Sequence, residues 1–207
     1  PISALFETMS GFTTTGATIL SNLESVPQSI HFWRHLTQWL GGMGVLILCI
    51  AILPFLGVGG MQVFRAEMTG PSKDRLTPRI TTTAKLLWGV YILISLSEVL
   101  LLHFVGKLSW FDSICHTFST VATGGFSTRS ESIGAFNSVS VDCIIMSFMF
   151  LCGINFQLHY FALLGKPKAY LKNSELKFFI SLILIVTTIT TISIFISMNN
   201  SFSDSLR

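Results

Sequence analysis

Long apolar runs alternate with short polar connections along this chain, and four of the runs are long enough to cross a lipid bilayer. They cover approximately residues 34–57, 84–105, 138–164 and 176–198. A hydrocarbon core about 30 Å thick needs roughly twenty helical residues, and every backbone amide inside it must be paired within its own segment. The pattern therefore predicts four membrane-spanning helices.

Two further runs, residues 2–11 and 110–120, are half apolar and too short to span. Each leads into a stretch rich in threonine and glycine, which reads SGFTTTGAT at 10–18 and STVATGGFS at 119–127. A polar return and a spanning helix come next in both cases. Non-helical backbone survives at membrane depth only where it is buried in protein or lines water. We therefore expect two re-entrant segments that face a pore or cavity.

The two stretches belong to a repeat with a spacing of 109 residues. The repeat superposes the pairs Ser10 and Ser119, Thr14 and Thr123, and Gly16 and Gly125. Agreement in the order of elements, at weak identity, is typical of a duplicated membrane unit. Because an even number of crossings separates the copies, both have the same orientation, and their axis should lie along the membrane normal.

Composition and charge fit a membrane protein. Half of the 207 residues are hydrophobic and 11% are charged, whereas soluble domains carry about a quarter charged residues. Nine of the 13 Lys and Arg residues lie at 58–85 and 165–177, so the positive-inside rule predicts two cytoplasmic connections. No basic residues alternate with aromatics along a groove, which argues against nucleic acid as a partner. The four cysteines lack metal-ligand spacing and are expected to be buried thiols.

The Thr/Gly stretches offer oxygen atoms without formal charge. Successive backbone carbonyls, aligned with the help of a glycine, can replace the hydration shell of a cation. Neither stretch contains a carboxylate, His or Cys, which magnesium or a transition metal would require. A single T-x-G match is most simply a polar turn, but two copies at equivalent places favour a path for a monovalent cation.

The chain resembles the membrane subunits of the bacterial Trk potassium-uptake family, in the Trk/Ktr/HKT superfamily. The resemblance covers essentially the whole chain and is carried by FETMSGFTTTGAT, HFWRHLTQWLGGMGVLILCIAILPFLGVGGMQVFRAE and HTFSTVATGGFST. It implies an all-α membrane protein of the bacterial inner membrane. Repeated units of outer helix, re-entrant pore helix with filter loop, and inner helix would form a pseudo-fourfold, potassium-channel-like pore.

The resemblance also implies which residues bind the ion. Potassium would be the transported ion, held by backbone carbonyls, with no covalently bound cofactor. The filter strands would be Thr13, Thr14, Thr15 and Gly16, and then Ala122, Thr123, Gly124 and Gly125. Gly16 and Gly125 would be the selectivity glycines, and glycine at both places favours potassium over sodium. Asn155 and Gln157 are candidates for the inner vestibule, with hydrogen bonding between helices an equal alternative.

By the same resemblance the chain is expected to be an internal fragment that lacks the third and fourth filter strands. The expected parts are unit 1 from its pore helix onward (1–57), a cytoplasmic loop (58–83), the complete unit 2 (84–164), a second cytoplasmic loop (165–175), and the outer helix of unit 3 with the start of an outer loop (176–207). Expected partners are membrane lipids, a second copy in a homodimer, and TrkA, a cytoplasmic nucleotide-binding regulatory subunit.

Other polar residues leave alternatives open. Glu98 lies mid-helix, where a carboxylate is costly; the simpler expectation is pairing with Ser95 or Ser97, or a packing role. His31 and His35 are expected to be interfacial anchors. The alternatives to potassium uptake are a structural membrane subunit, a sodium-permeable relative, or a membrane-embedded enzyme built on Glu98, His103 and His159, a set that has no catalytic or metal-ligand spacing.

Overall fold

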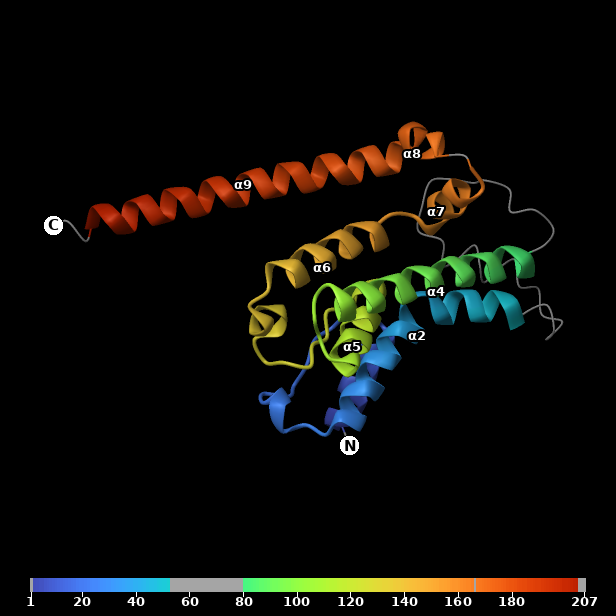
Figure 1. Ribbon diagram of the computed structural model, residues 1–207, viewed down its shortest axis with the longest axis horizontal. Helices are drawn as coiled ribbons and strands as arrows, with labels where there is room; N and C mark the ends of the chain where they lie inside the picture. The colour runs from blue at the N-terminus through green and yellow to red at the C-terminus, as the bar shows by residue number, and fades with distance from the viewer. Residues whose placement is uncertain (1, 53–79, 166, 205–207) are drawn as a thin grey trace. The chain divides into compact units, whose positions relative to one another are not determined.

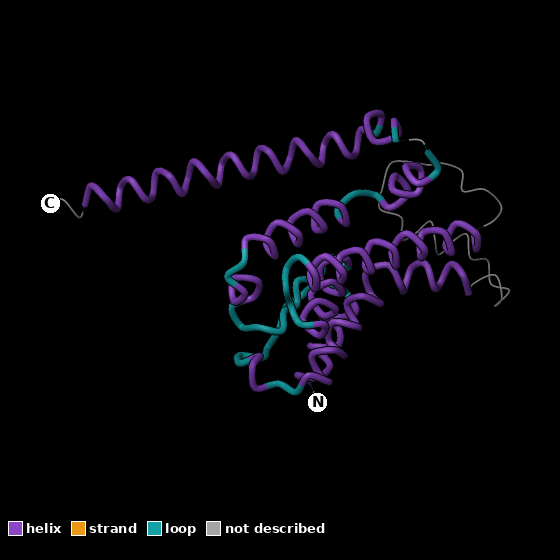
Figure 2. Tube along the Cα trace, in the orientation of Figure 1, coloured by secondary structure: helices purple, strands orange, loops and turns teal. Residues whose placement is uncertain are grey.

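The computed structural model describes residues 2–52, 80–165 and 167–204, and the regular elements in these ranges are helices (Figures 1 and 2). The chain divides into two compact units, residues 1–160 and 161–207. The first unit holds α1 (Ile2–Phe12), the 3-10 turn η1 (Leu23–Ser25), α2 (Gln28–Ile52), α4 (Ile80–Phe104), α5 (Trp110–Val121), the turn η2 (Ser132–Phe136) and α6 (Val139–Cys152). Helix α7 (Phe156–Leu163) crosses the boundary, and α8 (Lys168–Lys172) and α9 (Ser174–Asp204) follow.

Two of the predicted spans are confirmed as long helices. Within the described ranges, Leu86–Phe104 of α4 and Ser174–Ile196 of α9 are long and apolar enough to cross a membrane. Helix α9 begins after Asn173, whose side-chain oxygen accepts a hydrogen bond from the Leu176 amide at 2.8 Å and so caps the helix. The first predicted span begins earlier than expected, at Gln28, while its end, residues 53–57, lies outside the described residues. Of the predicted loop 58–83, residues 58–79 also lie outside them, and residues 80–83 are not loop, because α4 already begins at Ile80.

The prediction of one continuous helix over 138–164 is wrong. Helix α6 ends at Cys152 and α7 begins at Phe156. Glycine and asparagine, at positions 153 and 155, are poor helix formers. A backbone carbonyl at the end of α6 also has a hydrogen-bond partner outside that helix. The His159 ring nitrogen Nε2 bonds to the Leu151 carbonyl at 2.9 Å, which satisfies an acceptor that the helix end would otherwise leave free.

A short helix is present at each of the two places where a re-entrant helix is predicted, α1 at 2–12 and α5 at 110–121. The start of α5 is encoded locally by Ser109 and Asp112. The Ser109 hydroxyl accepts a hydrogen bond from the Asp112 amide at 3.0 Å and lies 2.8 Å from the Asp112 carboxylate, while the acidic first turn suits the helix dipole. Each of these helices has only about three turns, which is too short to span a bilayer.

Helix α2 contacts α1, α4 and α5, and α5 also contacts α4 and α6. Two buried clusters hold these helices together: Leu102, Leu108, Val141 and Ile145 in one, and Tyr91, Val121 and Cys152 in the other. In lipid such contacts stabilise by close packing rather than by removing apolar surface from water. The thiols of Cys115 and Cys152 are buried as expected, but Cys143 is exposed, which corrects its prediction. The side chain of Cys49 lies outside the described residues.

Candidate functional site

The two Thr/Gly segments, residues 13–16 and 122–125, follow the same backbone path. Thr14 and Thr123 have φ angles of 53° and 54°, and Gly16 and Gly125 have φ angles of 76° and 83°. Threonine rarely adopts this left-handed region. The same unfavourable conformation at the same two places therefore shows that the repeat seen in the sequence is a repeat of structure.

The backbone hydrogen bonds repeat as well, with each segment folded back onto the end of the short helix that precedes it, α1 or α5. The matching pairs are Thr14 to Gly11 and Thr123 to Thr120, both at 2.9 Å, and Thr15 to Ser10 at 2.9 Å with Gly124 to Ser119 at 2.8 Å. In each pair the amide of the first residue donates to the carbonyl of the second. Because these amides donate to carbonyls at the helix ends, α1 and α5 hold the segments in position.

The two segments also lie against each other. A Cβ atom on Gly16 would overlap the carbonyl oxygen of Gly124, so the two backbones approach as closely as only glycine permits. The approach of α2 has the same cause. A Cβ on Gly41 would overlap the Phe12 carbonyl, and a Cβ on Gly42 would lie 2.7 Å from Ala122 Cα.

The chemistry at the segments is that of neutral oxygen. The side chains of Thr13, Thr15 and Thr123 are exposed, and the hydroxyls of Thr13 and Thr15 are 2.8 Å apart. Among the residues that can be described, no group of three or more His, Cys, Asp or Glu side chains could hold a metal ion. Carbonyl and hydroxyl oxygens suit an ion without the strong hydration of a divalent cation.

One face of α2 is polar, and it is buried. His31, Arg34, His35 and Gln38 are spaced i, i+3, i+4 and i+7 and are 3%, 4%, 0% and 0% exposed. We call these four residues the polar face of α2. The interpretation of His31 and His35 as interfacial anchors is therefore wrong. Both have partners inside the protein, since His31 Nε2 bonds to the Leu23 carbonyl at 2.9 Å and His35 Nδ1 to the His31 carbonyl at 2.7 Å.

Arg34 contacts residues that follow each of the two Thr/Gly segments. Its Nε donates to the Glu7 carboxylate of α1 at 3.0 Å, and one terminal nitrogen donates to the Thr18 hydroxyl at 3.0 Å. Glu7 also accepts hydrogen bonds from the Thr18 hydroxyl and the Ile19 amide, both at 2.7 Å. The guanidinium carbon lies 4.2 Å from the centre of the Phe126 ring. This one side chain thus contacts the chain just beyond both segments.

Asp112 holds the chain just beyond the second segment. Its carboxylate accepts a hydrogen bond from the Thr128 hydroxyl at 2.8 Å, which fastens the return of the second segment to the start of α5. Arg129 is a looser partner, 3.8 Å from the carboxylate and 46% exposed.

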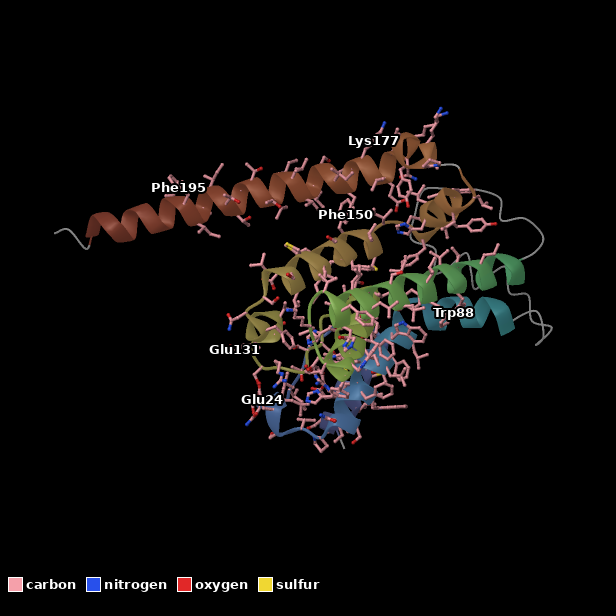
Figure 3. All side chains as sticks on the ribbon, viewed as in Figure 1. Glu24, Trp88, Glu131, Phe150, Lys177 and Phe195 are labelled. Atoms are coloured by element: carbon pink, nitrogen blue, oxygen red, sulfur yellow. The ribbon has the colours of Figure 1, made fainter. Side chains whose placement is uncertain are left out.

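The loops that follow the two Thr/Gly segments are joined through Glu24 and Ser130. The Glu24 carboxylate accepts hydrogen bonds from the Ser130 amide at 2.9 Å and the Ser130 hydroxyl at 2.6 Å. These bonds from Ser130 lower the pKa of Glu24 from 4.5 to about 2. Figure 3 shows Glu24 and Glu131 on the loops at one end of the first unit, with Trp88 toward the other end of α4.

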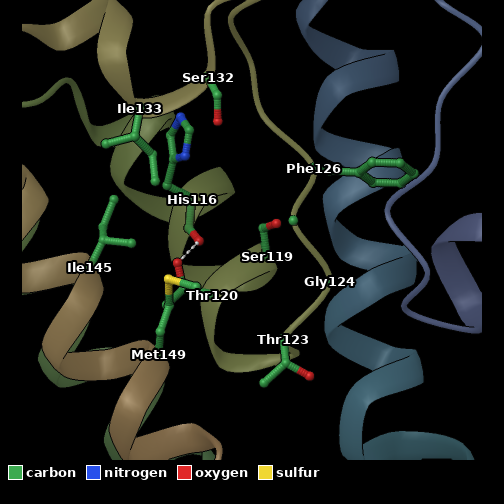
Figure 4. Close-up of a pocket in the computed structure, with 11 residues that line it drawn as sticks. His116, Ser119, Thr120, Thr123, Gly124, Phe126, Ser132, Ile133, Ile145 and Met149 are labelled. Carbon is green, nitrogen blue, oxygen red and sulfur yellow. Dashed lines mark hydrogen bonds between the residues drawn. The ribbon is translucent and has the colours of Figure 1, made fainter. Parts of the chain in front are cut away.

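A cavity of about 330 Å³ lies behind the second Thr/Gly segment, walled by α5, η2 and α6 (Figure 4). Its lining mixes hydroxyls with apolar side chains: His116, Ser119, Thr120, Ser132, Ile133, Ile145 and Met149. A Cβ on Gly125 would meet no described atom within 4 Å. The second segment is therefore packed against α2 on one side and open on the other.

The remaining candidates are dispersed. Glu98 is fully buried, and neither predicted hydroxyl pairs with it, because Ser95 donates to Tyr91 O and Ser97 to Leu93 O. The packing alternative for Glu98 is thus the one that the structure favours. His103 bonds to the Leu108 carbonyl and His159 to the Leu151 carbonyl, so the enzymatic reading gains no support.

Asn155, the first vestibule candidate, is exposed at the break between α6 and α7. The side chain of Gln157, the second candidate, lies outside the described residues. The polar face of α2 was missed as part of the site. Its signal is visible in HFWRHLTQ, where polar residues recur at the spacing that apolar residues have on an ordinary buried helix face.

The comparisons with known proteins agree on one family. The family model of TrkH, a cation transport protein, matches residues 2–201. The chain is 48% identical over 191 residues to the Trk system potassium uptake protein TrkH of Salmonella typhimurium, covering 91% of this chain and 39% of that protein. It is 46% identical over 205 residues to TrkH of Escherichia coli strain K12, covering 98% of this chain and 42% of that protein.

A solved structure gives the same result. The crystal structure of the potassium transporter TrkH from Vibrio parahaemolyticus matches with a TM-score of 0.73 at 37% identity, covering 90% of this chain and 37% of that chain. The chain therefore spans about two fifths of the length of the relatives that it matches.

Proposed function

Because this chain belongs to the TrkH family of cation transport proteins, we propose that it forms part of a pathway for potassium uptake across the bacterial inner membrane. In this proposal the two Thr/Gly segments are two of the strands of a selectivity filter. The transported ion is potassium, and no covalently bound cofactor takes part.

One observation carries the proposal: the two segments have the same backbone conformation, 109 residues apart, and meet at Gly16 and Gly124. Equivalent strands that meet side by side are what a ring of carbonyl oxygens requires. An isolated polar turn has no reason to occur twice in the same strained form. The relatives are named potassium uptake proteins, which fits a filter for that ion.

The proposed mechanism is replacement of water by backbone oxygen. The carbonyls of Thr13, Thr14, Thr15 and Gly16, and of Ala122, Thr123, Gly124 and Gly125, would take the place of hydration-shell oxygens. The neutral segments place no formal charge in the ion path, so a monovalent cation enters and leaves without strong trapping. The open side of the second segment, at the cavity, is where we place the third strand of a pseudo-fourfold ring.

The wider organisation belongs to the same proposal. Residues 1–57 would end unit 1, residues 84–164 would form unit 2, and residues 176–207 would begin unit 3, with cytoplasmic connections at 58–83 and 165–175. Asn155 and Gln157 are proposed for the inner vestibule. The whole protein would be a homodimer in contact with lipids and with the cytoplasmic nucleotide-binding subunit TrkA, for which the basic cytoplasmic connections offer the contact side.

The test uses the full-length protein in cells that lack other potassium uptake. Rubidium influx is measured with and without competing potassium and sodium, for the wild type and for Gly16→Ser and Gly125→Ser. Gly134→Ser is the matched control, because a Cβ on Gly134 meets nothing within 4 Å and its φ is not positive. The proposal expects potassium-competed influx that either filter variant impairs or makes less selective, while the control behaves as wild type.

Other outcomes are decisive too. If sodium suppresses the influx as strongly as potassium does, the result would favour a sodium-permeable relative. If wild-type influx is absent, or if both filter variants keep normal flux and selectivity at normal membrane levels, the hypothesis of an ion path fails. The alternative of a structural membrane subunit then remains.

A further inference from the structure

We propose that Gln38 of α2 is a positioning residue that holds the second Thr/Gly segment in register and thereby sets the discrimination of potassium from sodium. The inference rests on the proposed function, since it concerns the geometry of the same filter. Gln38 acts through the contact of its side-chain amide with the second segment and is not itself a ligand of the ion.

The contact between Gln38 and the second segment is direct. Gln38 is 0% exposed, and its Oε1 accepts a hydrogen bond from the Phe126 amide at 3.3 Å. Two residues earlier, a Cβ on Gly124 would overlap all three outer atoms of the Gln38 amide group. The planar amide thus lies flat against the backbone on both sides of Gly125, and glycine at 124 is what permits this approach.

The contact crosses from one repeat to the other. Gln38 lies on the helix that follows the first segment, and its partner Phe126 is 88 residues away in the second copy. Figure 4 shows the chain through Gly124 and Phe126 running between α5 and α2, the blue helix. A shift of the first copy therefore carries the second segment with it, which ties the two strands into one rigid pair.

The neighbours of Gln38 on the polar face of α2 act on the same residue. Arg34 lies over the Phe126 ring at 4.2 Å, and the His35 ring meets its edge with the centroids 6.1 Å apart. Phe126 is consequently held by its ring and by its backbone amide at once. This leaves the carbonyls of Gly124 and Gly125 little freedom to follow a smaller ion, and selectivity depends on that freedom.

Two further features support a positioning role for Gln38. Its Nε2 is buried with no hydrogen-bond partner in the part of the chain that the structure describes, an arrangement that folding alone disfavours. The repeat places Ser147 at the equivalent position of the second copy, and that hydroxyl donates to its own helix, to the Cys143 carbonyl at 2.7 Å. Gln38 is therefore a specific anchor of the second segment rather than a constant of the repeat.

The test measures rubidium influx and its competition by sodium in the full-length protein for Gln38→Met, which keeps the side-chain length and removes the amide. Gln28→Met, at the exposed first residue of the same helix, is the matched control. We expect Gln38→Met to reach the membrane and to lower potassium over sodium discrimination by about tenfold, the effect of roughly one lost hydrogen bond. The control should keep wild-type discrimination.

Unchanged discrimination in Gln38→Met at normal membrane levels overturns the inference. If that variant fails to reach the membrane, Gln38→Asn decides, because it keeps the amide but withdraws it by one methylene. Reduced discrimination in Gln38→Asn supports the inference; unchanged discrimination, or loss of this variant from the membrane as well, overturns it and leaves a residue needed for folding only. If Gly16→Ser and Gly125→Ser respond but Gln38→Met does not, this inference fails alone. If those glycine variants are silent, the proposed function fails.

Discussion

The Arg34 guanidinium on α2 lies 3.0 Å from the Glu7 carboxylate on α1, and the two side chains are 4% and 12% exposed. Removing one partner of a buried pair leaves an uncompensated charge, which costs about 3–5 kcal/mol. We therefore expect Arg34→Met and Glu7→Gln each to lower the stability of the purified full-length protein by about that amount. Thermal unfolding in detergent would measure the loss, and the double variant should lose less than the sum of the two.

Arg129→Met is the control for this prediction. Its carboxylate partner, Asp112, is 3.8 Å away and Arg129 is 46% exposed, so the loss should stay below about 1 kcal/mol. Equal losses at Arg34 and Arg129 would show that the Arg34 pair is not insulated from water.

The glycines of α2 should differ sharply although they lie within four residues. A Cβ on Gly41 or Gly42 would collide with the ends of α1 and α5, whereas at Gly44 the nearest contacts are an ordinary 3.8 Å. We expect Gly41→Ala and Gly42→Ala to cost about 1–3 kcal/mol through overpacking. Gly44→Ala should be neutral, or stabilising by up to about 1 kcal/mol from helix propensity. Thermal unfolding would rank them, and a uniform response would argue against the close approach.

The left-handed threonines predict a gain in stability at the expense of function. An L-residue other than glycine is destabilised by about 1–2 kcal/mol in this conformation. Replacing it with glycine removes this strain, but glycine also adds entropy to the unfolded chain, which offsets about 0.5–1 kcal/mol of the gain. Thr14→Gly and Thr123→Gly should thus stabilise the protein by about 0.5–1 kcal/mol while reducing ion discrimination in the influx assay.

Thr15→Gly is the matched control for the left-handed threonines, because Thr15 does not have a positive φ. It should lower stability, since there glycine adds entropy to the unfolded chain without relieving strain. A gain in stability at all three positions would mean that the segments are loose rather than strained.

The Glu24 to Ser130 link predicts a specific dependence on pH. The pKa of Glu24 is lowered from 4.5 to about 2, so its contribution is fully present above pH 4.5 and is lost as the pH falls toward 2. Hydrogen exchange, corrected for the intrinsic rate, should show the Ser130 amide losing protection across that window. Glu24→Ala should lack the protection at every pH, whereas Glu131→Ala, at a neighbouring exposed acid, should match the wild type. Protection that persists in Glu24→Ala would contradict the link.

Much of the helical framework could be predicted from the sequence, because the length and apolar composition of a run indicate a helix without any knowledge of its tertiary contacts. The short helices at 2–12 and 110–121, and the long helices α4 and α9, follow from such runs. The break between α6 and α7 could not be predicted as firmly, since glycine is tolerated inside α2 at Gly44 and not inside α6 at Gly153. What differs is tertiary: His159 supplies a partner for the end of α6.

The Thr/Gly segments could be located because two copies of the pattern stand in the same order. The polar face of α2 could not be placed, because a histidine or arginine near the start of a membrane helix usually lies at the water interface. Whether such residues face lipid headgroups or a neighbouring segment depends on contacts like Gln38 with Phe126, across 88 residues, which no local pattern contains.

The polar face of α2 also constrains how the protein is made. A helix α2 that is inserted alone carries an arginine, two histidines and a glutamine, whose partners in the folded protein include Leu23, Glu7 and Phe126, all outside α2. The partner Phe126 is synthesised after α2. The first half of α2 should therefore remain at the edge of the translocation machinery until the second repeat arrives, so that membrane insertion and tertiary folding of this region are a single late step.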